Sequence, residues 1–165
     1  NLTDGIDGLC SSVTVIYTAV FAVISGMLGM FGQRLLALCA AGGCVGFLMW
    51  NFPPAKVFMG DTGSMFLGGI VCALGVGCGV EFLMVLAAMV YILEALSVVI
   101  QSTVFKITKR IYHTKEGKRL FKMTPIHHHF ELSHWSEIKI DAVFSTVAAL
   151  FGAFAVVLAY GMFVR

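Results

Sequence analysis

The sequence predicts an all-helical membrane protein with several membrane-spanning helices. Of its 165 residues, 59% are hydrophobic and only 12% are charged, whereas about 25% of the residues of a soluble domain are charged. A soluble core of this size cannot hide so much apolar surface, which excludes an ordinary globular enzyme, a disordered tail and a secreted disulfide scaffold. The net charge of +2 is too small to indicate a nucleic-acid partner.

Five apolar runs are predicted to be the membrane-spanning helices of a single transmembrane domain, residues 1–165. About 20 apolar residues are needed to cross the hydrocarbon core of a bilayer. The predicted spans are 13–32, 35–50, 65–80, 82–105 and 142–164. Pro53 and Pro54, followed by Gly60 and Gly63, mark a loop between the second and third spans. Glu94 is the one acid within a span, and the sequence favours a functional and a structural role for it equally.

Basic residues orient these spans. Residues 106–122 carry seven Lys and Arg against one acid, Glu116, so the positive-inside rule places this segment in the cytoplasm. Alternation of the spans then assigns 1–12, 51–64 and 106–141 to the cytoplasmic side. Sixteen of the 20 Lys, Arg, Asp and Glu residues fall on that side, together with all five histidines. This distribution predicts an active site at the cytoplasmic interface.

The first polar segment, Asn1–Gly8, has two carboxylates, Asp4 and Asp7, beside two glycines. This composition is typical of a loop that runs into a helix. The carboxylates can hold Mg²⁺ or accept hydrogen bonds from a sugar or a base. The alternative is that an Asp only caps the helix that follows.

The second segment, 51–64, contains Asp61 close to two glycines and just before an apolar run. The glycines allow a diphosphate to approach the main-chain N–H groups, and Asp61 can bind a Mg²⁺ that bridges phosphate oxygens. Lys56 can offset phosphate charge. The alternative, a Pro/Gly turn with a capping Asp, explains the whole string poorly.

The third segment contains three consecutive histidines, His127–His129. A zinc site, a phosphate clamp and an expression tag are the alternatives. A tag is disfavoured because tags are terminal, and zinc is disfavoured because adjacent side chains diverge, by about 100° per residue in a helix. Imidazoles beside phosphates, close to the basic segment 106–122, are the favoured interpretation.

Together the three strings Asn1–Gly8, Asn51–Ser64 and Pro125–Glu131 resemble those of the phospho-N-acetylmuramoyl-pentapeptide transferases, within the polyprenyl-phosphate N-acetylhexosamine-1-phosphate transferase superfamily. The motif around Asp61 is common to the superfamily, and the triple His is more specific to the pentapeptide branch. The resemblance implies Mg²⁺-dependent transfer of phospho-MurNAc-pentapeptide from UDP-MurNAc-pentapeptide to undecaprenyl phosphate, which gives lipid I and UMP. It also implies a homodimer in the bacterial inner membrane, with the active site facing the cytoplasm.

The resemblance also assigns roles to residues. Asp61 is similar to the family's Mg²⁺ and catalytic aspartate. The remaining assignments are Asn1, Asp4 and Asp7 in the uridine and sugar-phosphate pocket, Gly5 and Ile6 beside the uracil, Phe58 stacked on it, Asn51 and Gln101 in the substrate groove, and His127, His128 and His129 as catalytic groups there.

Members of the family have ten spans, so the chain resembles their C-terminal half. The family's adjacent Asp pair belongs to the other half, and we therefore expect the chain alone to be inactive. Three alternatives stay open: a GlcNAc-1-phosphate transferase that uses UDP-GlcNAc, a non-catalytic fragment, and a transporter. The scarcity of charge within the spans disfavours the transporter. The sequence does not decide between direct attack by the lipid phosphate and a covalent intermediate.

Overall fold

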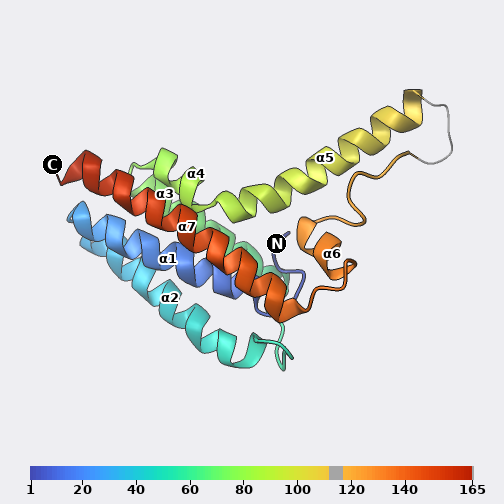
Figure 1. Ribbon diagram of the computed structural model, residues 1–165. Helices are drawn as coiled ribbons and strands as arrows, with labels where there is room; N and C mark the ends of the chain where they lie inside the picture. The colour runs from blue at the N-terminus through green and yellow to red at the C-terminus, as the bar shows by residue number, and fades with distance from the viewer. Residues whose placement is uncertain (112–116, 165) are drawn as a thin grey trace.

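The computed structural model describes residues 1–111 and 117–164. Residues 112–116 and 165 lie outside the described residues, and with them Lys115 and Glu116 of the basic segment. The helices in the described part of the chain, shown in Figure 1, are α1 (Leu9–Met27), α2 (Phe31–Asn51), α3 (Gly60–Gly77), α4 (Glu81–Ala87), α5 (Met89–Ile111), α6 (Ile126–Glu131) and α7 (Glu137–Phe163).

The predicted fold class is confirmed. Within residues 1–111 and 117–164 the regular structure is helical and contains no strand. Five helices, α1, α2, α3, α5 and α7, are long and apolar enough to cross a membrane. The chain is therefore a multi-pass membrane protein.

Four of the helices begin earlier than the apolar runs predict. α1, α2, α3 and α7 start at Leu9, Phe31, Gly60 and Glu137, because a helix can continue through polar residues that an apolar run leaves out. At α7 the Ser136 side chain caps the new start by accepting a hydrogen bond from the Lys139 N–H at 3.3 Å. The apolar run therefore locates each helix, while capping decides its first residue.

The prediction of one continuous span over 82–105 is wrong. The chain forms two helices there, α4 and α5, which are separated at Ala88. The Ala88 N–H still bonds to the Met84 carbonyl at 2.9 Å, but its backbone at φ −85° and ψ 12° leaves the helical region. The chain changes direction at this point, and α5 extends away from the other helices (Figure 1). Residues 82–105 contain neither Pro nor Gly, so the usual signal for a kink is absent from the sequence.

The core lies around α1, which packs against α2, α3 and α7. Tyr17 and Phe21 of α1 are buried and stacked with ring centroids 4.7 Å apart. The Tyr17 hydroxyl donates to the Val71 carbonyl of α3 at 2.8 Å, which satisfies the one polar atom of the ring. α5 differs, because its buried residues all lie in its first half, at Val90, Glu94 and Ser97.

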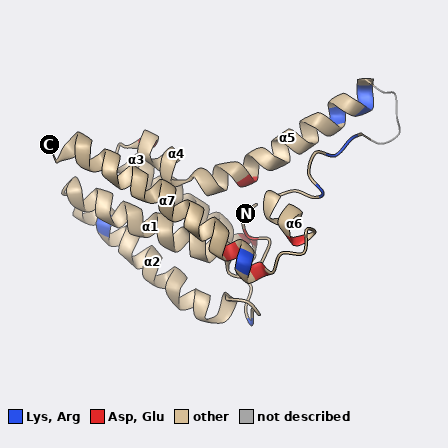
Figure 2. Cartoon of the chain, viewed as in Figure 1, with Lys and Arg blue, Asp and Glu red and all other residues tan. Residues whose placement is uncertain are grey.

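Charge is unevenly distributed over the described residues. Figure 2 shows acidic residues near α6 and the start of α7, and basic residues at the far end of α5. Residues 142–163, the rest of α7, contain no Lys, Arg, Asp or Glu. The end of the bundle where the loop 1–8 and α6 lie is therefore the polar end.

Candidate functional site

Hydrogen bonds that involve side chains of both segments join the loop 1–8 to the segment 51–64. Asn1 Nδ2 donates to Asp61 Oδ1 at 2.7 Å. The Asp7 carboxylate accepts a hydrogen bond from the Ala55 N–H at 2.8 Å. Asn51 is buried and accepts from the Gly8 N–H at 3.2 Å. Two polar strings that are far apart in the sequence therefore form one surface.

Asp61 lies in the first turn of α3 and is exposed. The N-cap residue of α3 is Met59 and that of α1 is Gly8, and neither helix has a side-chain cap bond at its start. The capping alternatives for Asp4, Asp7 and Asp61 are therefore wrong. Asp61 Oδ1 accepts from Asn1, whereas Oδ2 has no partner in the described part of the chain.

Asp4 lies close enough to Asp61 for the two charges to interact. Burial raises the pKa of Asp4 above its ordinary value, and the negative charge of Asp61 raises it further. No group of three or more His, Cys, Asp or Glu side chains suited to a metal ion occurs among residues 1–111 and 117–164. Mg²⁺ is usually held by one or two carboxylates together with substrate phosphates and water. An exposed Asp61 with Asp4 nearby fits a metal of that kind.

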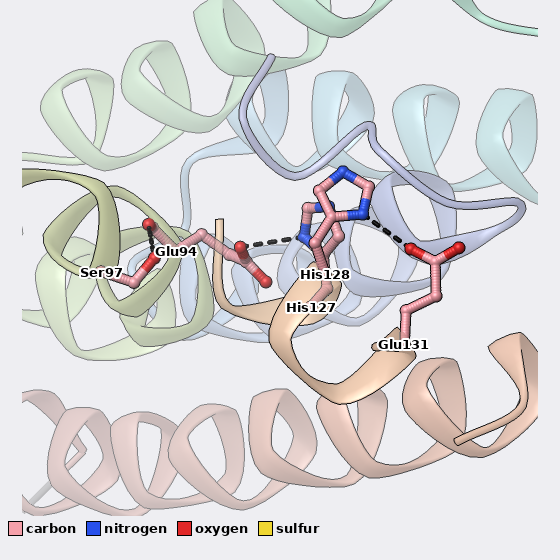
Figure 3. Close-up of polar contacts among 5 residues, drawn as sticks. All are labelled: Glu94, Ser97, His127, His128 and Glu131. Atoms are coloured by element: carbon pink, nitrogen blue, oxygen red, sulfur yellow. Dashed lines mark hydrogen bonds and ion pairs between the residues drawn. The ribbon is translucent and has the colours of Figure 1, made fainter. Parts of the chain in front are cut away.

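The three histidines lie on α6, which follows directly after Pro125. Their Nδ1 atoms contact three different partners. His127 Nδ1 lies 3.0 Å from Glu94 Oε2, and His128 Nδ1 lies 2.7 Å from Glu131 Oε2 (Figure 3). The third, His129, accepts a hydrogen bond at Nδ1 from a main-chain N–H, that of Lys122, at 3.1 Å. The three Nδ1 atoms therefore have different partners, although the His127 and His128 rings lie side by side, with centroids 4.3 Å apart.

Gly5 brings the loop 1–8 against α6. A Cβ atom at this position would collide with Nε2 of His127 and would lie 3.2 Å from Nε2 of His128. Because glycine has no Cβ, the loop can approach both rings. The loop 1–8 therefore contacts the second string through Asn1 and the third through Gly5, so all three predicted strings lie together.

Two predicted substrate residues have their amide groups occupied by main-chain atoms. Asn51 Nδ2 donates to the Val57 carbonyl at 3.0 Å, in addition to the bond that Asn51 accepts from Gly8. Gln101 accepts from the N–H groups of Leu120 and Phe121, at 2.9 and 3.0 Å, and donates to the Phe121 carbonyl at 3.0 Å. Both residues hold the loops in place, and their contacts with substrate stay predictions.

Two apolar candidates occupy different environments. Phe58 is 75% exposed, so one face of its ring is free to stack on a base. Ile6 is half-buried and packs against the core cluster that contains Leu9 and Ile140. Their roles beside the uracil stay predictions.

The sequence did not reveal the partner of Glu94. Glu94 and His127 are both 0% exposed, and each is the other's ionisable partner. The signal for Glu94 was present, since an acid in an apolar run is costly without a partner. Nothing in the sequence indicated that this partner is His127, because His127 lies 33 residues away on another helix.

The chain is similar to known proteins. The model of glycosyl transferase family 4 matches residues 1–79. Phospho-N-acetylmuramoyl-pentapeptide-transferase of Carboxydothermus hydrogenoformans is 51% identical over 150 residues, which are 91% of this chain and 44% of that protein. The chain belongs to this family of transferases. The proteins of the same name from Clostridium beijerinckii and Acetivibrio thermocellus are 46% and 44% identical, each over 91% of this chain.

The chain spans less than half the length of the curated relatives that it matches. It covers 44% of the Carboxydothermus protein. The match to those relatives nevertheless extends well beyond residues 1–79. It therefore includes most of the chain that follows α3, where the family model gives no match.

Proposed function

We propose that the chain is part of an enzyme that transfers phospho-MurNAc-pentapeptide from UDP-MurNAc-pentapeptide to undecaprenyl phosphate, giving lipid I and UMP. The relatives named phospho-N-acetylmuramoyl-pentapeptide-transferase support this proposal. The observation that carries it is the meeting of the three strings, through the bond from Asn1 to Asp61 and the contact of Gly5 with His127.

The arrangement suits a reaction between a water-soluble and a lipid substrate. The strings lie at the polar end of a bundle of apolar helices (Figure 2). The headgroup of a lipid and a soluble nucleotide can both reach such a place. Phosphoryl transfer depends mainly on positioning and on charge neutralisation. Asp61, with Asp4 beside it, would hold Mg²⁺, which supplies the neutralising charge when bound.

The other groups position the reacting parts. Asn1 directs the Asp61 carboxylate, the imidazoles of α6 face the phosphates, and Phe58 stacks on the base. The basic side chains at 106–122 support a cytoplasmic position for this end of the molecule, in the bacterial inner membrane. As in the family it resembles, we propose that the enzyme works as a homodimer.

Release of UMP tests this proposal. The protein is expressed from its complete coding sequence, and its membranes are supplied with undecaprenyl phosphate and labelled UDP-MurNAc-pentapeptide. We expect Asp61→Asn to lower the rate by about 1,000-fold, because a metal-binding charge is lost. Glu81→Gln makes the same change of carboxylate to amide at the exposed start of α4 and should leave the rate unchanged.

Two further conditions decide between the alternatives. Removal of divalent cations with EDTA should stop UMP release, and Mg²⁺ should restore it. Use of UDP-GlcNAc in place of UDP-MurNAc-pentapeptide would select the GlcNAc-1-phosphate transferase instead. An unchanged rate in Asp61→Asn would refute the role of Asp61.

A further inference from the structure

Glu94 and His127 form an isolated polar pair inside the protein. Glu94 lies in the first half of α5 and His127 lies on α6, and both side chains are 0% exposed. The only hydrogen bond of either side chain among the described residues joins Nδ1 to Oε2 at 3.0 Å (Figure 3). Two lone pairs would repel each other at this distance, so a proton lies between the two atoms.

We propose that Glu94 is a positioning residue that holds this proton on Nδ1 of His127 and so turns Nε2 toward the loop 1–8. The inference rests on the proposed function, in which His127 contacts the substrate. It adds to that function a residue that touches none of the reacting atoms and acts only through the imidazole.

The far side of the ring supports a functional orientation. Nε2 of His127 is buried and has no hydrogen-bond partner in the described part of the chain. It lies against Gly5, next to Asp4 of the substrate-pocket string. Buried polar atoms are nearly always hydrogen-bonded. This ring nitrogen therefore lies at the meeting point of two site strings and lacks the partner that a buried polar atom normally has.

A purely structural role explains the pair less well. Replacement of a buried ion pair by apolar residues of similar volume is often neutral or stabilising. Leu or Met at both positions would join α5 to α6 without leaving any polar atom unpaired. The pair instead leaves two buried atoms without partners among the described residues, Nε2 of His127 and Oε1 of Glu94. A carboxylate that fixes the tautomer of an imidazole explains the use of polar residues at this position.

The polar side chains beside the pair have hydrogen-bond partners of their own. The His128 ring lies 4.3 Å from the His127 ring, centroid to centroid. His128 has its own carboxylate partner, Glu131, which is 45% exposed. Ser97, one turn after Glu94, donates to the Glu94 main-chain carbonyl at 2.6 Å and does not touch its carboxylate. Glu94 is therefore the only described carboxylate that His127 contacts.

Kinetics of Glu94→Gln give the first test, on membranes that contain the protein from its complete coding sequence. The amide has the shape of the carboxylate but no longer requires a proton on Nδ1. We expect kcat for UMP release to fall 10- to 100-fold, while KM for UDP-MurNAc-pentapeptide changes less than about 3-fold. Ser97→Ala, which removes a buried hydroxyl from the same face of α5, and Glu81→Gln should both keep the parent kcat.

Nitrogen NMR of ¹⁵N-histidine-labelled protein in detergent gives the second test, with His127→Gln to assign the signals. In the parent protein we expect the proton of His127 on Nδ1. In Glu94→Gln we expect this pattern to change. A parent ring with its only proton on Nε2 overturns the proposal, even if no variant folds.

The remaining outcomes are equally decisive. A kcat of Glu94→Gln equal to that of the parent protein overturns the proposal. A lower kcat with unchanged His127 signals overturns it too, as does a rise in KM alone. If the parent protein releases no UMP, the proposed function fails. The NMR signals would still show whether Glu94 fixes the ring, so the two failures are distinguishable.

Discussion

Asp61 and Glu94 are two carboxylates that lie near the same loop, yet their environments are opposite. Asp61 is exposed, and one of its oxygens has no partner in the described part of the chain. Glu94 is fully buried and is joined to His127. An exposed carboxylate can accept a metal ion or a substrate group at little cost. A buried one depends on its partner and can act on the site only through that partner.

The two carboxylates should also differ in what they contribute to folding. Asp61 sits in the first turn of α3, where the helix dipole favours a negative charge by a few tenths of a kcal/mol. Removal of Glu94 would leave the His127 ring without its only hydrogen-bonded side-chain partner among the described residues. A buried polar ring without a partner costs free energy. Activity and stability should therefore separate at these two positions.

The largest effect on stability is expected for Glu94→Ala. Loss of one partner of a buried pair costs about 3–5 kcal/mol, whereas Asp61→Ala should cost about 0.5 kcal/mol or less because the residue is exposed. Unfolding of the detergent-solubilised protein, followed by circular dichroism, measures both.

The double variant Glu94→Ala with His127→Ala sharpens this comparison. His127→Ala removes the ring that Glu94→Ala leaves unpaired. His127→Ala should therefore lower the free energy of unfolding less in the Glu94→Ala background than in the parent protein. Equal costs for Glu94→Ala and Asp61→Ala would mean that the buried pair contributes nothing, and the contrast between the two acids would disappear.

An intermediate effect is expected for Gly5→Ala, which acts on the contact between the two regions. The added methyl group would collide with the His127 ring, so the loop or the ring must shift. Overpacking of this kind costs about 1–3 kcal/mol. Gly43→Ala is the matched control, because a Cβ there meets nothing within 4 Å. It lies inside α2 and should not destabilise the protein.

The His127 nitrogen signals give a second measurement on the same pair of variants. They should move in Gly5→Ala and stay in place in Gly43→Ala. If neither the stability nor the signals of Gly5→Ala change, the loop 1–8 does not press against α6, and the two regions are independent.

The sequence predicts more of the fold than of the side-chain pairing. Apolar runs predict the number of spanning helices because the thickness of a bilayer fixes the length of a run. They do not predict the break at Ala88, which lies in a stretch without Pro or Gly. No local residue preference therefore signals the direction of α5.

The three polar strings show the same division. Their residue types predict which segments form the site, because carboxylates, glycines and histidines share the chemistry of phosphates and metal ions. They do not predict that Asp7 and Asn51 are bonded to main-chain N–H groups of neighbouring loops. Such bonds depend on which loop lies opposite, and one-dimensional spacing contains no information on that.

The smallest effect is expected for Gln101→Ala, which tests whether the position of α6 depends on the segment that precedes it. The Gln101 side chain makes three hydrogen bonds to Leu120 and Phe121, and the next residue, Lys122, donates from its N–H to His129. Because the Leu120 N–H is partly open to water, we expect a loss of only about 1 kcal/mol.

The change should be local, so hydrogen exchange is the better measurement. The amides of Leu120 and Phe121 should exchange faster in Gln101→Ala, and those of α1 should not. Gln33→Ala, at the other end of the bundle, is the control and should leave the exchange of residues 120 and 121 unchanged. Unchanged exchange in Gln101→Ala would show that α6 keeps its place without this anchor. The pair of Glu94 and His127, together with the packing of Ile126 and Phe130 against the cluster that contains Val90, would then hold α6 against α5.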